Sequence, residues 1–183
     1  MAAALMLLFV TRLGLTALLA AAALAASASG IPAAYSSVVI EPTGGPAQAE
    51  FDLTAVQARA KRENKRLYVY LGANDCPYCR KYEAFLDQHS AELVPQFKSH
   101  NFIIVDLRSS LSLQANKLLI RVGANSLPYA DFQRSIGDAR ARLLVYPSVW
   151  LFDTNLKPLM QMPAGTGTFQ TVPEQLEILR LEQ

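Results

Sequence analysis

The stretch that decides the fold runs over residues 65–88, KRLYVYLGANDCPYCRKYEAFLDQ. Its first part, residues 67–71, is rich in aromatic and aliphatic side chains and ends at Gly72, which predicts a buried central strand. Its second part, residues 75–88, has helical character. Pro77 is tolerated in a first helical turn because its missing N–H would be unpaired there. We therefore predict a strand followed by a helix, with Cys76 and Cys79 at the junction.

These two cysteines are the only ones in the chain. At a helix N-terminus, unpaired N–H groups and the positive end of the helix dipole stabilise a thiolate. This predicts Cys76 as a nucleophile. Cys79 lies almost one turn further on, where it can resolve a mixed disulfide formed at Cys76. The redox group is then the cysteine pair itself, and no metal or organic cofactor is expected.

Other roles for the pair have less support. A structural disulfide that closes so short a loop removes little entropy from the unfolded chain. A zinc site would need His89 or His100 as further ligands, and neither histidine shows paired ligand spacing. Haem attachment needs a histidine directly after Cys79, where the chain has Arg80.

The composition fits one globular domain. The chain has 183 residues, of which 51% are hydrophobic and 17% charged, and this balance argues against wholesale disorder. A net charge of +2 without a long basic run does not favour nucleic-acid binding.

The N-terminus predicts export. Residues 13–25, LGLTALLAAAALA, have the length of a signal-peptide core, and Ala-Ser-Ala follows at 26–28. We expect a signal peptide over residues 1–28, with an uncleaved membrane anchor as the alternative. Either case places the domain outside the cytoplasm, in the periplasm or otherwise exported. Residues 29–50 are rich in Gly, Pro, Ala and Ser and are predicted as a linker. The folded domain is expected over residues 51–183.

The remaining elements predict an α/β fold with a mixed central sheet and helices on both faces. Pro95 is expected to break or kink the helix that follows the cysteines. The expected helices cover residues 51–64 and 173–181, and the expected strands cover residues 102–107, 148–153 and 158–162.

Residues 109–143 have the weakest pattern. Helical periodicity covers residues 111–122, and residues 126–131 suggest a turn around Pro128. This segment is predicted either as an insertion that shapes a substrate surface or as a helical elaboration packed on the core.

Residues 65–88, with FIIVDL at 102–107 and YPSVWLFD at 146–153, resemble the thioredoxin superfamily, in particular its exported thioredoxin-like thiol–disulfide oxidoreductases. The resemblance covers residues 51–183, with a longer segment than usual before the proline of residue 147. It implies a cis-proline loop at Tyr146-Pro147, whose backbone would pair with a substrate's extended chain. An ordinary trans proline at a strand start is the alternative. Pro77 and Tyr78 are expected to border the substrate.

The chain departs from the family pattern at two positions beside the cysteines. Asp75 stands where thioredoxins usually carry Trp, and Tyr70 stands where they carry a buried acid that helps proton transfer. We expect the Asp75 carboxylate to tune the pKa of Cys76, against the effect of the helix end. A rival proline, Pro173 in Thr-Val-Pro, matches glutaredoxins, but a helix-like segment follows it where the family pattern has a strand.

The expected function is an exported thiol–disulfide oxidoreductase that exchanges the Cys76–Cys79 disulfide with protein thiols or disulfides. It would need a separate electron donor or acceptor protein, which is membrane-bound in one alternative. No nucleic acid or metal partner is expected. The reductase direction is favoured by the similarity to exported reductases and because Asp75 is expected to disfavour the reduced thiolate. The alternatives are a non-catalytic thioredoxin-like binding or assembly module, a glutaredoxin-like activity and a disulfide oxidase.

Overall fold

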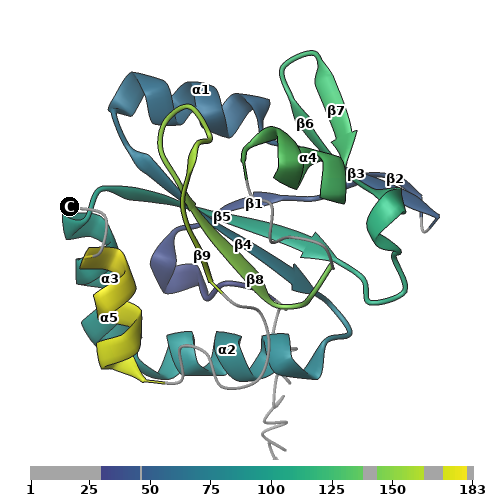
Figure 1. Ribbon diagram of the computed structural model, residues 1–183. Helices are drawn as coiled ribbons and strands as arrows, with labels where there is room; N and C mark the ends of the chain where they lie inside the picture. Colours follow the sequence, from purple (N-terminus) through teal and green to yellow (C-terminus); the bar gives the residue numbers. More distant parts are fainter. Residues whose placement is uncertain (1–29, 46, 138–143, 163–170, 181–183) are drawn as a thin grey trace, which may run out of the picture.

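The computed structural model describes residues 30–45, 47–137, 144–162 and 171–180 (Figure 1). The expected signal peptide lies outside these residues. Among the described helices, none combines the length and apolar character needed to cross a bilayer. The elements follow one another along the chain as η1 (Ala33–Tyr35), β1 (Val38–Ile40), β2 (Thr43–Gly45), β3 (Gln48–Asp52), α1 (Thr54–Glu63), β4 (Arg66–Ala73), α2 (Pro77–Gln88), α3 (Ser90–Ser99), β5 (Phe102–Ser109), η2 (Ala115–Lys117), β6 (Leu118–Val122), β7 (Asn125–Pro128), α4 (Tyr129–Ser135), β8 (Ser148–Phe152), β9 (Pro158–Met162) and α5 (Val172–Arg180).

The main sheet has five strands in the order β1-β5-β4-β8-β9. The strands β1, β5 and β4 are parallel, whereas β8 and β9 run antiparallel to their neighbours. Alternate side chains of β4 enter two separate cores. Leu67, Val69 and Leu71 pack on one face, and Tyr68 and Tyr70 pack on the other. The expected α/β fold with a mixed central sheet and both faces covered is therefore confirmed.

Helices cover both faces of this sheet (Figure 1). Side chains of α2, α3 and α5 pack in one core, together with Tyr35 of η1. The opposite core takes side chains from α1 and α4. There, Tyr129 and Phe132 of α4 contact Trp150 and Phe152 of β8, with ring centroids 5.9 and 6.5 Å apart.

The prediction of a linker over residues 29–50 is wrong for the described residues within it. Ile31 and Tyr35 are buried in the core, and the Tyr35 hydroxyl donates to the Leu86 carbonyl at 2.8 Å. The strand β1 extends the main sheet by parallel pairing of Val38 with Val105. The pairing partner lies far along the chain, and so the local composition carries no sign of it. The domain therefore begins before residue 51.

A second sheet has the order β2-β3-β6-β7. It changes two expectations. The predicted helix over residues 51–64 begins only at Thr54, because Phe51 lies in β3 and pairs with Ile120 of β6. The prediction of a helix over residues 111–122 is also wrong, since Leu118 and Ile120 alternate into the core as strand residues.

For the remaining helices and strands, the observed boundaries differ less from the predicted ones. The helix after the cysteines ends at Gln88, and Pro95 lies inside the next helix, α3, where the burial of Leu93 and Phe97 holds the chain helical. In place of the expected turn around Pro128, β7 ends at that residue and α4 begins at the next. Residues 109–143 thus pack on the core partly as strands, with residues 138–143 outside the described part.

The burial of Tyr35 gives a first prediction. Tyr35→Ala should lower the free energy of unfolding by about 3 kcal/mol, because it removes a large buried side chain and leaves the Leu86 carbonyl unpaired. Chemical denaturation measures this difference. A loss of only a few tenths of a kcal/mol, as for a residue in a linker, would contradict the structure.

A second prediction concerns the ion pair that joins three strands of the second sheet. Both oxygens of Glu50 accept from Arg121, at 2.7 and 2.9 Å, and Ser126 also donates to Glu50. Hydrogen bonds from Arg121 first, and then from Ser126, lower the pKa of Glu50. The ionised Glu50 side chain therefore stabilises the folded state at pH values above the ordinary carboxyl pKa of 4.5. This stabilisation is lost as the pH falls through the lowered pKa of Glu50.

Glu50→Gln should accordingly lower the melting temperature at neutral pH, and the deficit should shrink as the pH falls from about 6 to about 3. Glu41→Gln, a change at an exposed carboxylate, serves as the control. A deficit that is independent of pH would show that the charge of Glu50 is not the cause.

Candidate functional site

The candidate site lies where β4 ends and α2 begins. Cys76 and Cys79 form a disulfide with a Cα–Cα distance of 5.2 Å. Cys76 is the N-cap residue of α2, and its Sγ accepts a hydrogen bond from the Cys79 N–H at 3.1 Å. Pro77 occupies the first helical position, as expected. The chain therefore places the Cys76 sulfur against the N-terminal turn, where backbone N–H groups favour negative charge.

Both cysteines are buried, although a nucleophilic cysteine is expected to be more exposed than a resolving one. Cys76 is 2% exposed and Cys79 is fully buried. Pro77 and Tyr78 between them are exposed, and the Lys81 Nζ lies 5.5 Å from the centroid of the Tyr78 ring. An attack on the Cys76 sulfur thus requires local opening around it.

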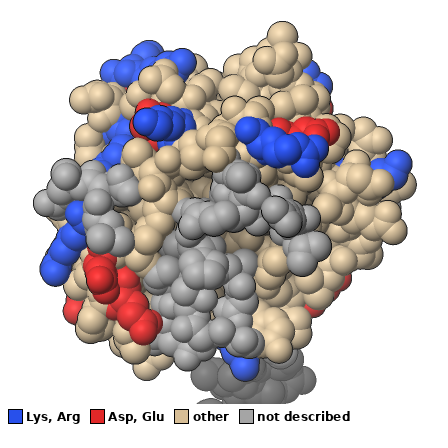
Figure 2. Space-filling view, viewed as in Figure 1, with Lys and Arg blue, Asp and Glu red and all other residues tan. Residues whose placement is uncertain are grey.

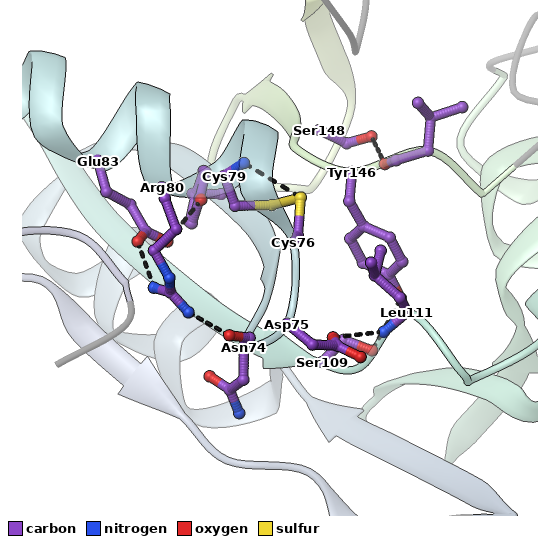
Figure 3. Close-up of a disulfide and its surroundings, with 12 residues drawn as sticks. Asn74, Asp75, Cys76, Cys79, Arg80, Glu83, Ser109, Leu111, Tyr146 and Ser148 are labelled. Carbon is purple, nitrogen blue, oxygen red and sulfur yellow. Dashed lines mark hydrogen bonds and ion pairs between the residues drawn. A yellow bond between two sulfur atoms is a disulfide. The ribbon is translucent and has the colours of Figure 1, made fainter. Parts of the chain in front are cut away.

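The Tyr146-Pro147 loop lies beside the disulfide (Figure 3). Its peptide bond is cis, and Pro147 directly precedes β8. The Tyr146 side chain is buried, and its hydroxyl donates to the Ser109 Oγ at 2.8 Å. Burial raises the pKa of Tyr146, although the bond to Ser109 opposes this rise. Pro173, the rival proline, lies in the first turn of α5.

Asp75 contacts a neighbouring loop. Its Oδ1 accepts the Leu111 N–H at 2.8 Å, and its Oδ2 accepts from the Ser110 hydroxyl at 3.4 Å. The sequence shows the charge of Asp75, but it does not show the hydrogen bonds of this carboxylate to Ser110 and Leu111. Asp75 therefore links the segment before Cys76 to the end of β5, besides any electrostatic effect on the sulfur.

A polar network that sequence reasoning missed lies behind the cysteines. The Tyr70 hydroxyl donates to Glu83 Oε1 at 2.9 Å, and Arg80 Nη1 donates to Glu83 Oε2 at 2.7 Å. Arg80 also donates to the Asn74 carbonyl, so that it bridges α2 and the loop before Cys76 (Figure 3). Helical periodicity could have found Glu83, because residues 79, 83 and 86 share the buried face of α2.

Tyr70 occupies the position where the resemblance implies a buried acid. Burial, and then the nearby charge of Glu83, raise the pKa of Tyr70 and keep its hydroxyl protonated. Gly72 leaves room for this ring, since a Cβ there would lie 2.6 Å from Tyr70 Cε1. A second buried carboxylate, Asp106 on β5, accepts the Ile31 N–H at 3.0 Å and also bonds to Arg108. Burial raises the pKa of Asp106.

Charged side chains of both signs are interspersed over the face seen in Figure 2. Within the described parts of the chain, no group of three or more His, Cys, Asp or Glu side chains is placed to hold a metal ion.

No family model and no curated protein matches the chain. Among solved structures, it is similar to the first two thioredoxin domains of Saccharomyces cerevisiae Eps1p, with 13% identity and a TM-score of 0.40 over 76% of this chain and 41% of that one. It is also similar to a reduced Schistosoma mansoni thioredoxin pre-protein, with 11% identity and a TM-score of 0.41 over 80% of this chain and 100% of that one. A third similar structure is the exposed lipoprotein thioredoxin Etrx1 of Streptococcus pneumoniae strain TIGR4. Its identity is 16% and its TM-score is 0.36, over 66% of this chain and 87% of that one. The fold assignment rests on the strand order of the main sheet and on the helices that cover its two faces.

The Tyr70–Glu83 contact gives a third prediction. Tyr70→Phe should lower the free energy of unfolding by about 1.5–3 kcal/mol, because it removes a buried hydrogen bond to a carboxylate. In a double-mutant cycle with Glu83→Ala, the two losses should be less than additive. Additive losses would show that the hydroxyl and the carboxylate contribute independently.

Proposed function

We propose that the protein is an exported thiol–disulfide oxidoreductase that works in the reductase direction on protein disulfides. One observation carries the chemistry: the Cys76–Cys79 disulfide closes the first turn of α2, with the Cys76 sulfur at the N-cap. The export of the protein is inferred from the apolar N-terminal sequence alone. The direction rests on Asp75, whose carboxylate beside Cys76 disfavours the thiolate and so lowers the reduction potential.

The reaction begins with the reduced pair. The Cys76 thiolate attacks one sulfur of a substrate disulfide, the substrate S–S bond breaks, and the leaving thiolate takes up a proton. Cys79 then loses its proton and attacks Cys76 in the mixed disulfide, which releases the second substrate sulfur as a thiol. Two electrons pass to the substrate, and the Cys76–Cys79 disulfide forms. A separate thiol protein or membrane electron donor must reduce it again.

Four residues around the pair are proposed to bind the substrate. Pro77 and Tyr78 lie exposed between the cysteines, and the backbone of Tyr146 and Pro147 would pair with an extended segment of the substrate. The neighbouring Asp75 is proposed to tune the pKa of Cys76.

A fourth prediction tests the proposed roles of the cysteines. Cys79→Ser should accumulate a mixed disulfide between Cys76 and an oxidised substrate peptide, because the resolving thiol is missing. Cys76→Ser should form none and lose exchange altogether. Mass spectrometry after alkylation identifies the adduct, and the two variants serve as matched controls for each other. Equal adduct formation by both variants would contradict the assignment of Cys76 as nucleophile and Cys79 as resolving cysteine.

The reduction potential tests the direction. Equilibration with dithiothreitol or glutathione should give a value near that of thioredoxin, about −270 mV. A value near about −120 mV would identify an oxidant and overturn the reductase direction.

The burial of both sulfurs favours one further candidate, a non-catalytic binding or assembly module with an incidental disulfide. Such a module would keep its binding partner in the Cys76→Ser variant, and its folded disulfide would fail to equilibrate with either buffer.

A further inference from the structure

The strand β5 extends beyond the end of its neighbour β1. It pairs with β4 along its whole length, but β1 covers its other edge only from Val105 to Leu107. The chain before β1 does not continue this pairing, because η1 is a 3-10 helix and Ser36 has a left-handed backbone with a φ of 52°. In the described part of the chain, the edge of β5 at Phe102–Ile104 therefore has no strand beside it. An open edge of this kind is a template for another strand.

A cavity of about 250 Å³ lies at this open edge, and we call it the edge slot. It is lined by Phe102, Ile103 and Ile104 of β5 and by Tyr35 and Ser36, which precede β1. Sites that enclose a small-molecule ligand usually measure about 300–1,000 Å³, so the edge slot is smaller than such a site. Its size and its place beside a strand favour a segment of chain over an enclosed small molecule.

Cations line the edge slot from both faces of the main sheet. Arg59 lies on α1 and Lys98 on α3, and these helices pack on opposite faces of the sheet (Figure 1). Lys65, which precedes β4, is the third cation. Arg59 and Lys65 share one carboxylate, Glu63, at 2.8 and 2.9 Å, whereas Lys98 forms no ion pair with any residue that the structure describes. The edge slot therefore carries an excess of positive charge.

An extended acidic segment matches both the open edge and the charge. Its backbone can pair with β5, as peptides do when they add a strand to a sheet. Successive side chains of a strand point to opposite faces. Two adjacent acidic residues would thus turn one carboxylate towards Arg59 and Lys65 and the other towards Lys98. A helical segment cannot pair in this way, because its backbone groups bond to one another.

We propose that the edge slot binds an extended acidic segment of a partner protein, which adds to β5 as a short strand beside Phe102–Ile104. The edge slot lies at the start of β5, where β4 also begins, whereas the disulfide follows the end of β4. The eight residues of β4 separate the two sites by about 25 Å. A partner bound at the edge slot leaves the face around the disulfide free. The inference goes beyond the proposed function and does not depend on thiol chemistry.

Three peptides test this proposal on the full-length protein with its disulfide intact. The first, acetyl-Thr-Val-Glu-Glu-Val-Thr-amide, has two adjacent acidic residues among β-branched ones, which favour an extended chain. The second has Gln in place of both Glu residues. The third keeps both Glu residues but carries a methyl group on each of their backbone nitrogens, so that neither can donate a hydrogen bond to β5. Titrations followed by the amide chemical shifts of the protein give the dissociation constant and the place of binding.

The Glu-Glu peptide should bind with its largest shifts at Phe102–Ile104 and with none at Cys76. The Gln-Gln peptide should bind at least about fivefold more weakly, because it cannot pair with the cations. The methylated peptide should also bind at least about fivefold more weakly, because it loses a backbone hydrogen bond to the strand. Equal binding of the methylated peptide would show that charge alone holds the segment, and this would overturn the strand addition. No binding of the Glu-Glu peptide would overturn the whole proposal.

A charge reversal in the protein tests the site itself. Lys98→Glu should weaken binding of the Glu-Glu peptide at least about fivefold, because it replaces attraction by repulsion on one face of the edge slot. Lys117→Glu makes the same change of net charge at an exposed lysine of η2 and should leave the binding nearly unchanged. Equal weakening by the two variants would show that only the net charge matters, and the edge slot would not be the site.

Cys76→Ser separates this inference from the proposed function. The variant loses thiol exchange in the proposed function, but it should bind the Glu-Glu peptide with the dissociation constant of the wild-type protein. If the wild-type protein binds the peptide and fails in exchange, only the proposed function is lost. If it exchanges disulfides and binds no peptide, only the inference about the edge slot is lost.

Discussion

The burial of β4 from Leu67 onward, at the centre of the main sheet, is the constraint on which the site depends. The strand pairs with β5 on one side and with β8 on the other, and its side chains fill both cores. A strand held in this way fixes the point where the chain leaves the sheet, and Cys76 follows after only Asn74 and Asp75. The same two neighbours carry the other parts of the site, because β5 ends at Ser109 and β8 begins at Ser148. The disulfide, the loop of Leu111 and the loop of Pro147 therefore meet at one sheet edge.

Charge around the disulfide is largely taken up by local partners. Arg80 is bound to Glu83 and to the Asn74 carbonyl, and Asp75 accepts two hydrogen bonds from the 110–111 loop. Both charged residues thus hold the backbone that carries Cys76. The Cys76 sulfur itself lies at the N-cap of α2 and accepts the Cys79 N–H.

Much of this arrangement could be predicted from sequence, and each of the missing parts has a physical cause. The strands β4, β5, β8 and β9 are runs of apolar residues bounded by turn residues, and the helix after Cys76 begins with a proline, so local signals suffice. The strands β1 and β6 were missed because β1 is three residues long, and because the spacing of Leu118 and Val122 suits a helix as well as a strand. Within the site, the cysteines follow from their spacing. The bonds of Asp75 to Leu111 and of Tyr146 to Ser109 join distant parts of the chain, and no local pattern indicates them.

The parallel pairing of the early strands has a consequence for how the chain reaches this structure. Val38 finds its partner at Val105, and Ala49 finds its partner at Leu118. Neither sheet can close until the middle of the chain is available, and contacts so far apart along the sequence slow folding. During synthesis, which proceeds from the N-terminus, β1 and the paired strands β2 and β3 must wait for these later partners. The cysteines would be available to oxidants throughout that interval, so the disulfide can form before the sheets that later bury it.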